Sequence, residues 1–148
     1  MRHRRAGEGN PRQFVVVLST GDEVSTSLLD FAARESVTSA SFTAIGAMRG
    51  AVLAFFEWES KEYRDIPVEE QVEVLSLNGN ITTREGAPHL HVHAVLSRPD
   101  GSTVGGHFKE GVVRPTLEIF VTEHPGEIVR TRDEETGLPL INLPEGAE

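Results

Sequence analysis

The chain is 148 residues long, carries 14 basic and 23 acidic side chains for a formal net charge of −9, and contains no cysteine. This length fits one domain, and the missing cysteine excludes disulfides, thiolate metal sites and cysteine nucleophiles. No run of eighteen apolar residues is present, so we expect no membrane-spanning helix. The basic start, MRHRRAGEGNPR, lacks the apolar stretch of a secretory signal, and we expect a cytoplasmic protein.

Charge is unevenly distributed along the chain. Residues 1–12 carry four arginines against one glutamate, whereas residues 133–148 carry five acidic side chains and no basic one. We interpret these segments as a basic flexible head and an acidic tail, with one domain over residues 13–132 between them. Four apolar residues at 138–143 form a short arm, which packs either on the core or on a neighbouring subunit. Because the rest of the chain is acidic and repels phosphates, we expect DNA binding to be weak and to depend on the head.

The first 35 residues predict a strand followed by a helix. Residues 13–20 (QFVVVLST) form a β-rich run, which indicates the first strand. Asp22 follows as the predicted N-cap of a helix from about residue 23 to residue 35. Apolar residues recur at helical spacing from Val24 to Phe31, so we expect this helix to cover one face of a sheet.

The rest of the chain predicts strands, at residues 40–46, 50–58, 62–66, 71–77, 89–97, 103–108 and 116–122. The segment at 50–58 is apolar on both faces, which is typical of a central strand. Asn78-Gly79 is expected to bend or bulge the chain. Pro99-Asp100-Gly101 is turn chemistry and predicts a hairpin around it. Together these elements predict a single α+β domain with a mostly antiparallel sheet and a helix packed on it.

Histidines concentrate on one predicted strand. His89, His91 and His93 occupy alternate positions, so their side chains point to the same face. The row is roughly 13 Å long, whereas zinc–nitrogen bonds measure about 2.0–2.1 Å. One ion can therefore be reached by two adjacent members of the row, but hardly by all three.

The predicted hairpin supplies a third imidazole. If the residues that flank the turn pair with each other, His93 faces His107 on the next strand, and His91 lies diagonally within side-chain reach. Gly105 and Gly106 are expected to keep side chains out of the approach to His107. Three imidazoles leave one coordination position open, as catalytic or ligand-binding zinc sites do. We therefore predict that these three histidines bind one divalent transition ion, with zinc as the expected metal.

Several alternatives stay open around this cluster. A polar histidine cluster at a subunit interface is the alternative to a metal site. His89 is an additional ligand candidate, although this register puts it beyond comfortable reach of His107. Glu118 is either an acceptor that holds one of the histidine rings or an exposed residue of an alternating strand. Trp58 and Tyr63 are interpreted as packing residues.

The segment at residues 79–121, GNITTREGAPHLHVHAVLSRPDGSTVGGHFKEGVVRPTLEIFV, combines an HxH pair, a DG turn and a GGH motif. With RQFVVVLSTGDEV and FTAIGAMRGAVLAFFEWESKEY before it, the chain resembles the plants-and-prokaryotes conserved (PPC) domain over roughly residues 12–124. The resemblance implies an α+β fold, a homotrimer and a DNA-binding label, and its motif histidines correspond to His91, His93 and His107. Stand-alone prokaryotic members look like metal-capable trimers. Plant members carry an AT-hook, whereas the head of this chain has no Arg-Gly-Arg-Pro core.

Two functions follow from these features. The first is a trimeric binding or regulatory module that associates with nucleic acid or protein partners. The second is a metal-dependent enzyme that acts on a small molecule through a zinc-bound water. The acidic core argues against direct DNA binding, and the open three-histidine site favours small-molecule chemistry. The lack of an obvious general base near the histidines weakens the enzyme interpretation, and the sequence names no substrate.

Overall fold

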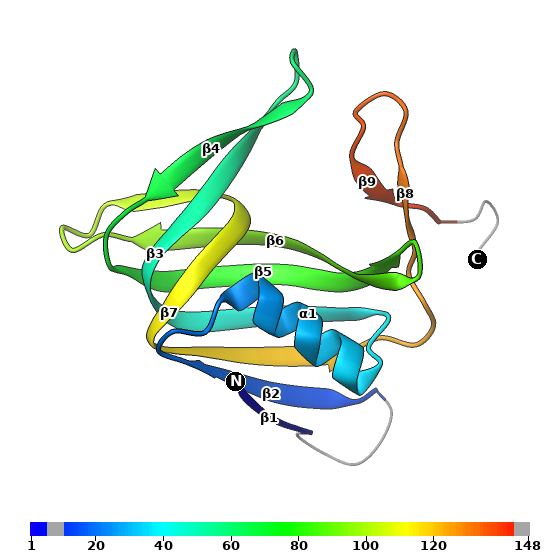
Figure 1. The fold of residues 1–148 in the computed structure, drawn as a ribbon, viewed down its shortest axis with the longest axis horizontal. Helices are drawn as coiled ribbons and strands as arrows, with labels where there is room; N and C mark the ends of the chain where they lie inside the picture. Colours follow the sequence, from blue (N-terminus) through cyan, green and yellow to red (C-terminus); the bar gives the residue numbers. More distant parts are fainter. Residues whose placement is uncertain (6–10, 144–148) are drawn as a thin grey trace.

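One helix and nine strands follow one another along residues 1–5 and 11–143, which are the part of the chain that the computed structural model describes (Figure 1). For residues 2–5 only the backbone is described. The elements are β1 (Arg2–Arg5), β2 (Gln13–Ser19), α1 (Val24–Glu35), β3 (Ala40–Glu57), β4 (Glu62–Val68), β5 (Val72–Arg84), β6 (Ala87–Ser97), β7 (Thr103–Glu123), β8 (Arg130–Arg132) and β9 (Pro139–Ile141). The predicted α+β class with a mostly antiparallel sheet is confirmed.

Seven strands form one sheet in the order β1-β2-β7-β6-β5-β3-β4, in which β7 also pairs with β3. The sequence predicted four short strands where the structure has two long ones. Residues 40–46 and 50–57 belong to β3, and residues 103–108 and 116–122 belong to β7. Register shifts between Gly46 and Gly50 let the long strands change direction without breaking. The two halves of β3 and of β7 therefore pair with different neighbouring strands. As a result the sheet wraps around the core.

Helix α1 lies across one face of the sheet (Figure 1). The predicted N-cap was wrong by one residue, because Glu23 caps the helix and accepts hydrogen bonds from the backbone N–H groups of Ser25 and Thr26 at 3.1 and 2.7 Å. The longer glutamate also reaches the backbone N–H of Gly111 in β7, at 3.2 Å. Asp22 instead binds the backbone N–H of Ser19 and, at 2.8 Å, the N-terminal amine.

The hydrophobic core fills the space between α1 and the sheet. Alternate residues of the strands point toward the helix, and the ring of Phe14 meets Phe31 edge-on with centroids 5.2 Å apart. The opposite face of the sheet leaves apolar side chains exposed on four neighbouring strands, at Ile45, Leu75, Val95 and Phe120. Among the residues that the structure describes, no helix is long and apolar enough to cross a membrane.

Strand β5 runs straight through Asn78-Gly79, so the predicted bend is wrong. Both residues keep partners on β3 and on β6. A Cβ at Gly79 would lie 2.5 Å from the Phe42 ring and 2.7 Å from the His91 carbonyl oxygen. The glycine therefore makes room for a core ring within a regular strand. The irregularity of β5 lies earlier, between Val74 and Ser76.

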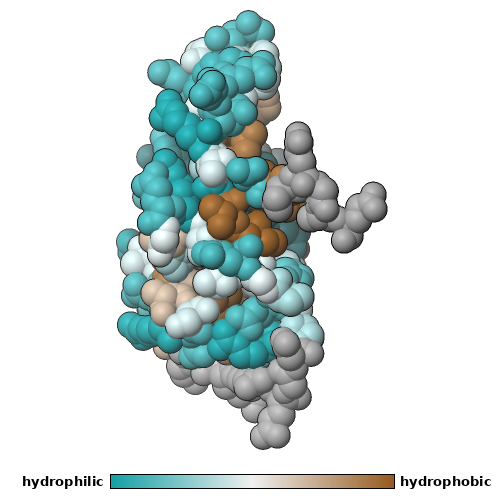
Figure 2. Space-filling model, turned by 90° about the vertical axis from the view of Figure 1, so that its right-hand side faces the viewer, coloured by the Kyte–Doolittle hydropathy of each residue, from teal (hydrophilic) through white to brown (hydrophobic). Residues whose placement is uncertain are grey.

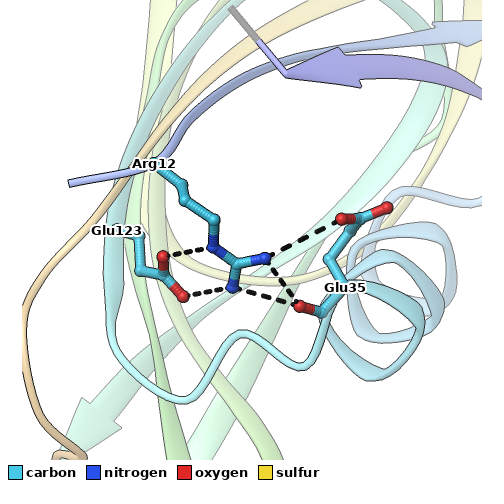
Figure 3. Close-up of polar contacts among 3 residues, drawn as sticks. All are labelled: Arg12, Glu35 and Glu123. Atoms are coloured by element: carbon cyan, nitrogen blue, oxygen red, sulfur yellow. Dashed lines mark hydrogen bonds and ion pairs between the residues drawn. The ribbon is translucent and has the colours of Figure 1, made fainter. Parts of the chain in front are cut away.

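The sequence predicted a flexible head over residues 1–12, and the structure describes the backbone of its first residues as strand β1. Arg2–Arg5 pair antiparallel with β2, because that strand would otherwise leave an unpaired sheet edge. Residues 6–10 lie outside the described part. Arg12, at the end of the head, donates two hydrogen bonds to the Glu123 carboxylate and two to the Glu35 carbonyl oxygen (Figure 3). The hydrogen bonds that Arg12 donates to Glu123 raise the pKa of its guanidinium. Through its contacts with Glu35 and Glu123, Arg12 ties α1 to the end of β7.

Candidate metal centre

The β6–β7 hairpin has the predicted turn and register. The backbone N–H of Arg98 donates to the Ser102 carbonyl oxygen at 2.8 Å. Five residue pairs follow along the hairpin, and in the last of them His93 faces His107. His91 lies one alternate position away on the same face of β6. Local turn chemistry and strand alternation thus bring these three side chains together.

The three imidazoles converge. One ring nitrogen from each of His91, His93 and His107 lies within 4.8 Å of the others, and the ring centroids are 5.2–5.4 Å apart. Nitrogens bound to one tetrahedral zinc ion are separated by roughly 3.4 Å. Small rotations of the side chains would therefore suffice for all three to share one ion.

His107 is the member of the cluster with the least water around it. Its Nδ1 atom is buried and has no hydrogen-bond partner among the described residues. Burial, followed by the neighbouring His91 and His93, lowers the pKa of His107 to about 4. Burial and the charge of Arg130 also lower the pKa of His91. Both rings are therefore neutral at neutral pH, which is the form that binds metals, and the unsatisfied nitrogen fits a role as a ligand.

A glycine beside the cluster serves the sheet and not the approach to the site. A Cβ at Gly106 would lie 2.7 Å from the Ala54 carbonyl oxygen of β3. The missing side chain allows β3 and β7 to come close together at His107, which pairs with Ala54. The prediction that Gly106 clears the approach to His107 is therefore corrected.

Tyr63 of β4 stacks on His107, with ring centroids 4.7 Å apart and an angle of 29° between the ring planes. The tyrosine ring also meets Phe56 edge-on, with ring centroids 5.3 Å apart. The sequence interpretation of Tyr63 as a packing residue missed this contact with the cluster. Strand β4 reaches His107 only because β3 pairs with both β4 and β7, a long-range arrangement that local pattern does not reveal.

Arg130 of β8 is a second residue that the sequence did not point to. Its side chain is buried, with only 5% of the residue exposed. The guanidinium donates to the Thr82 hydroxyl at 3.0 Å, the Asn80 side-chain oxygen at 3.0 Å and the Pro139 carbonyl oxygen at 2.7 Å. One of its nitrogens also lies 3.5 Å from Nδ1 of His91. Burial lowers the pKa of Arg130, but its ordinary value above 12 keeps the group charged at neutral pH.

The two additional candidates differ in their relation to the cluster. His89 is half-buried and lines the same cavity as His91 and His107, and burial together with Arg130 lowers its pKa. Glu118 is exposed and pairs with Ile45 of β3. Ile45 lies nine residues before Ala54, the residue of β3 that pairs with His107. Glu118 thus lies at an exposed position of an alternating strand, and within the described part of the chain no hydrogen bond joins it to a histidine ring.

A cavity of about 170 Å³ opens beside the histidines. Its lining combines Tyr63, His89, Leu90, His91, His107, Arg130, Leu138, Pro139 and Leu140. The apolar arm at 138–143 therefore supplies one wall, from β9 and the residue before it, and Tyr63 of β4 supplies another. The β3–β4 hairpin and the β8–β9 hairpin both rise from the same side of the sheet (Figure 1). Figure 2 looks at the side of the β8–β9 hairpin and shows hydrophobic side chains gathered within a mostly hydrophilic surface; this segment exposes Val129, Leu140, Ile141 and Leu143.

By its fold and its site the chain is an α+β domain in which a wrapped antiparallel sheet packs on one helix, within the described residues, and carries three histidines at its β6–β7 hairpin. The chain belongs to the Plants and Prokaryotes Conserved domain family, whose model matches residues 5–125. No curated protein matches the sequence.

Solved structures share this fold over most of their length. A metal-containing protein from Archaeoglobus fulgidus is 34% identical, with 88% of this chain and 93% of that chain covered and a TM-score of 0.83. A plant- and prokaryote-conserved protein from Pyrococcus horikoshii is 30% identical, with 90% and 93% covered and a TM-score of 0.83. A proposed DNA-binding protein from Bacteroides thetaiotaomicron is 28% identical, with 95% and 96% covered and a TM-score of 0.87.

Proposed function

We propose that the chain is a metal-dependent binding module in which His91, His93 and His107 hold one divalent transition ion, with zinc as the first choice. The observation that carries this proposal is the convergence of three ring nitrogens within 4.8 Å beside a cavity. Three protein ligands leave a position at the metal for water or a small molecule. The likeness to a metal-containing protein from Archaeoglobus fulgidus agrees with it.

When bound, the ion supplies Lewis-acid chemistry at its open position. The chain's own residues orient what enters the cavity. Tyr63 stacks on His107 and fixes the plane of that ring, while Leu138 and Leu140 give the cavity an apolar wall. The module therefore binds a small molecule between the histidines and the β8–β9 hairpin.

An enzyme that acts on a small molecule is the second candidate, and His89 is the observation that favours it. This histidine lines the cavity, and burial with the nearby charge of Arg130 lowers its pKa. It is therefore unprotonated at neutral pH and able to accept a proton from a bound molecule. No such base was evident from the sequence.

The first test is metal analysis of the full chain, purified without a polyhistidine tag and dialysed with each candidate metal. We expect one ion per chain for the wild type, and far less for H91A, H93A and H107A. H124A is the matched control, since His124 is exposed and contacts Ser41 instead of the cluster. Wild-type protein that binds no metal at neutral pH would rule out the proposal and leave the histidines as a polar cluster at an interface.

We also propose that the module is a homotrimer. Exposed apolar side chains on the sheet face opposite α1, at Ile45, Leu75, Val95 and Phe120, support this assembly because a monomer has little reason to expose a contiguous apolar surface. Light scattering of the wild type should give three times the monomer mass, and F120E should give a smaller mass. L29E is the control because Leu29 is exposed on α1. A monomer mass for the wild type at micromolar concentration would contradict the proposal.

A further inference from the structure

Arg130 is a buried cation whose partners are all neutral. Its hydrogen bonds run to a hydroxyl, an amide oxygen and a backbone carbonyl oxygen. In the part of the chain that the structure describes, no carboxylate pairs with it. A buried charge without a counter-charge is costly, so a guanidinium in this setting calls for an anion from outside the chain.

The cavity beside Arg130 has an unbalanced charge. None of its lining residues is acidic, and four of them are the cation Arg130 and three histidines. A divalent ion on the three-histidine site would add two further positive charges. The protein supplies no negative charge to this cavity from the residues that line it, which leaves that role to the ligand.

The position and the donors of Arg130 suit a carboxylate. A guanidinium has five N–H donors in a planar fork that matches the two oxygens of a carboxylate. Three are used in the bonds to protein oxygens, and the contact with Nδ1 of His91 is long at 3.5 Å. N–H donors of Arg130 therefore remain available directly beside His91, one of the proposed metal ligands. A small molecule that contacts both Arg130 and the metal ion would lie there.

The size and walls of the cavity favour a small organic acid over inorganic phosphate. About 170 Å³ equals the volume of roughly five or six water molecules in the liquid. Leu90, Leu138 and Leu140 form apolar walls, which suit a short carbon chain and offer nothing to the outer oxygens of a phosphate.

We propose that this cavity binds a small 2-oxo or 2-hydroxy monocarboxylate, with its carboxylate on Arg130 and its second oxygen toward the open position between His91, His93 and His107. This inference rests on the proposed metal site and names the class of ligand for it. Arg130 is then the residue that selects acids over neutral molecules of the same shape.

Calorimetry on the full chain loaded with cobalt or zinc tests the assignment, with lactate and pyruvate as probes and lactamide as the neutral analogue. The visible spectrum of the cobalt form gives a second readout at the metal. We expect lactate or pyruvate to bind at least about tenfold more tightly than lactamide. Binding should weaken by a similar factor in R130Q, whereas R132Q, on the same strand but exposed, should bind like the wild type.

Metal content measured on each variant separates the two proposals. If the wild type holds no metal, the metal site itself fails. If R130Q keeps its metal and binds lactate as tightly as the wild type, or if lactamide or phosphate binds as well as lactate to the wild type, the carboxylate assignment is wrong. If R130Q fails to fold, L140W tests the assignment instead. Leu140 is an exposed residue that lines the cavity, so a tryptophan there fills the cavity. Retained metal together with lost lactate binding in L140W would support the assignment. Unchanged lactate binding in L140W would overturn it.

Discussion

Two arginines of the domain show how differently a protein can hold a cation. Arg12 closes a bidentate pair with Glu123 and binds the end of α1 (Figure 3). Arg130 is more deeply buried, and its partners among the described residues are all neutral. The first arginine is electrostatically complete within the chain, and the second is not.

This contrast separates structure from binding. Where charge is balanced locally, as at Arg12, removal of a partner should affect stability and nothing else. Around Arg130 and the histidines, nitrogen atoms and a positive charge are left without matching groups, and their natural partners are a metal ion and an anion. Changes there should affect binding far more than folding.

The largest effect is expected for the loss of one imidazole. H107A should lower metal affinity by about a hundredfold or more, because only two ligands remain. The hairpin should persist, since its turn and its five residue pairs do not depend on the ring. Calorimetric titration with zinc and circular dichroism measure the two effects.

H89A provides the matched comparison, because His89 lines the cavity but is not one of the three clustered rings. Its metal affinity should change by less than about tenfold. Loss of metal in H89A together with its retention in H93A would contradict the assignment of the ligands.

The metal-free protein should lose stability in mild acid. The pKa of His107 falls from 6.5 to about 4 on folding, so the unfolded chain binds more protons than the folded chain between these values. The free energy of unfolding should therefore be constant above pH 6.5, fall by about 3 kcal/mol as the pH drops to 4, and level off below it. Urea unfolding of EDTA-treated protein at pH 7.5, 5.5 and 4.5 measures this change.

H107Q should reduce the pH dependence, because glutamine does not titrate. H124Q is its control, since the exposed His124 lies outside the cluster. Equal acid sensitivity of the wild type and H107Q would show that other groups dominate this range.

A smaller effect is expected at the other arginine. E123Q keeps the shape of the side chain but removes the charge that faces Arg12. Because this pair is only partly buried, the free energy of unfolding should fall by about 1 kcal/mol. Metal and lactate affinity should stay at wild-type values, as measured by the same titrations. A change in either affinity would contradict the separation between a structural role for Arg12 and a binding role for Arg130.

Local chemistry in the sequence predicted the part of the site that lies within one hairpin. The Pro-Asp-Gly turn and the strict alternation determine that His93 faces His107, and both signals are short-range. Tyr63 and Arg130 could not be predicted, because they reach the histidines through strands far apart in the chain.

The fold shows the same division between short-range and long-range signals. The antiparallel sheet and the helix follow from hydrophobic periodicity. The continuity of β3 and β7 depends on register shifts at glycines that resemble turns in sequence. The choice of Glu23 over Asp22 as N-cap depends on the backbone of Gly111 in a distant strand.

The smallest effect is expected for DNA. Arg12 is occupied by Glu123, so among the arginines predicted to form the basic head only Arg2, Arg4 and Arg5 stay as candidates for phosphate contacts. The chain as a whole is acidic, with a net charge of −9, which opposes close approach to a duplex. We therefore expect a dissociation constant weaker than about 1 µM for duplex DNA at 150 mM salt, typical of nonspecific binding. Fluorescence anisotropy with a labelled duplex should show this binding only at low salt. Replacement of the three head arginines by glutamine should abolish it, while R12Q should leave it unchanged and lower only stability. Nanomolar binding at 150 mM salt that survives the triple replacement would show that another surface of the domain recognises DNA.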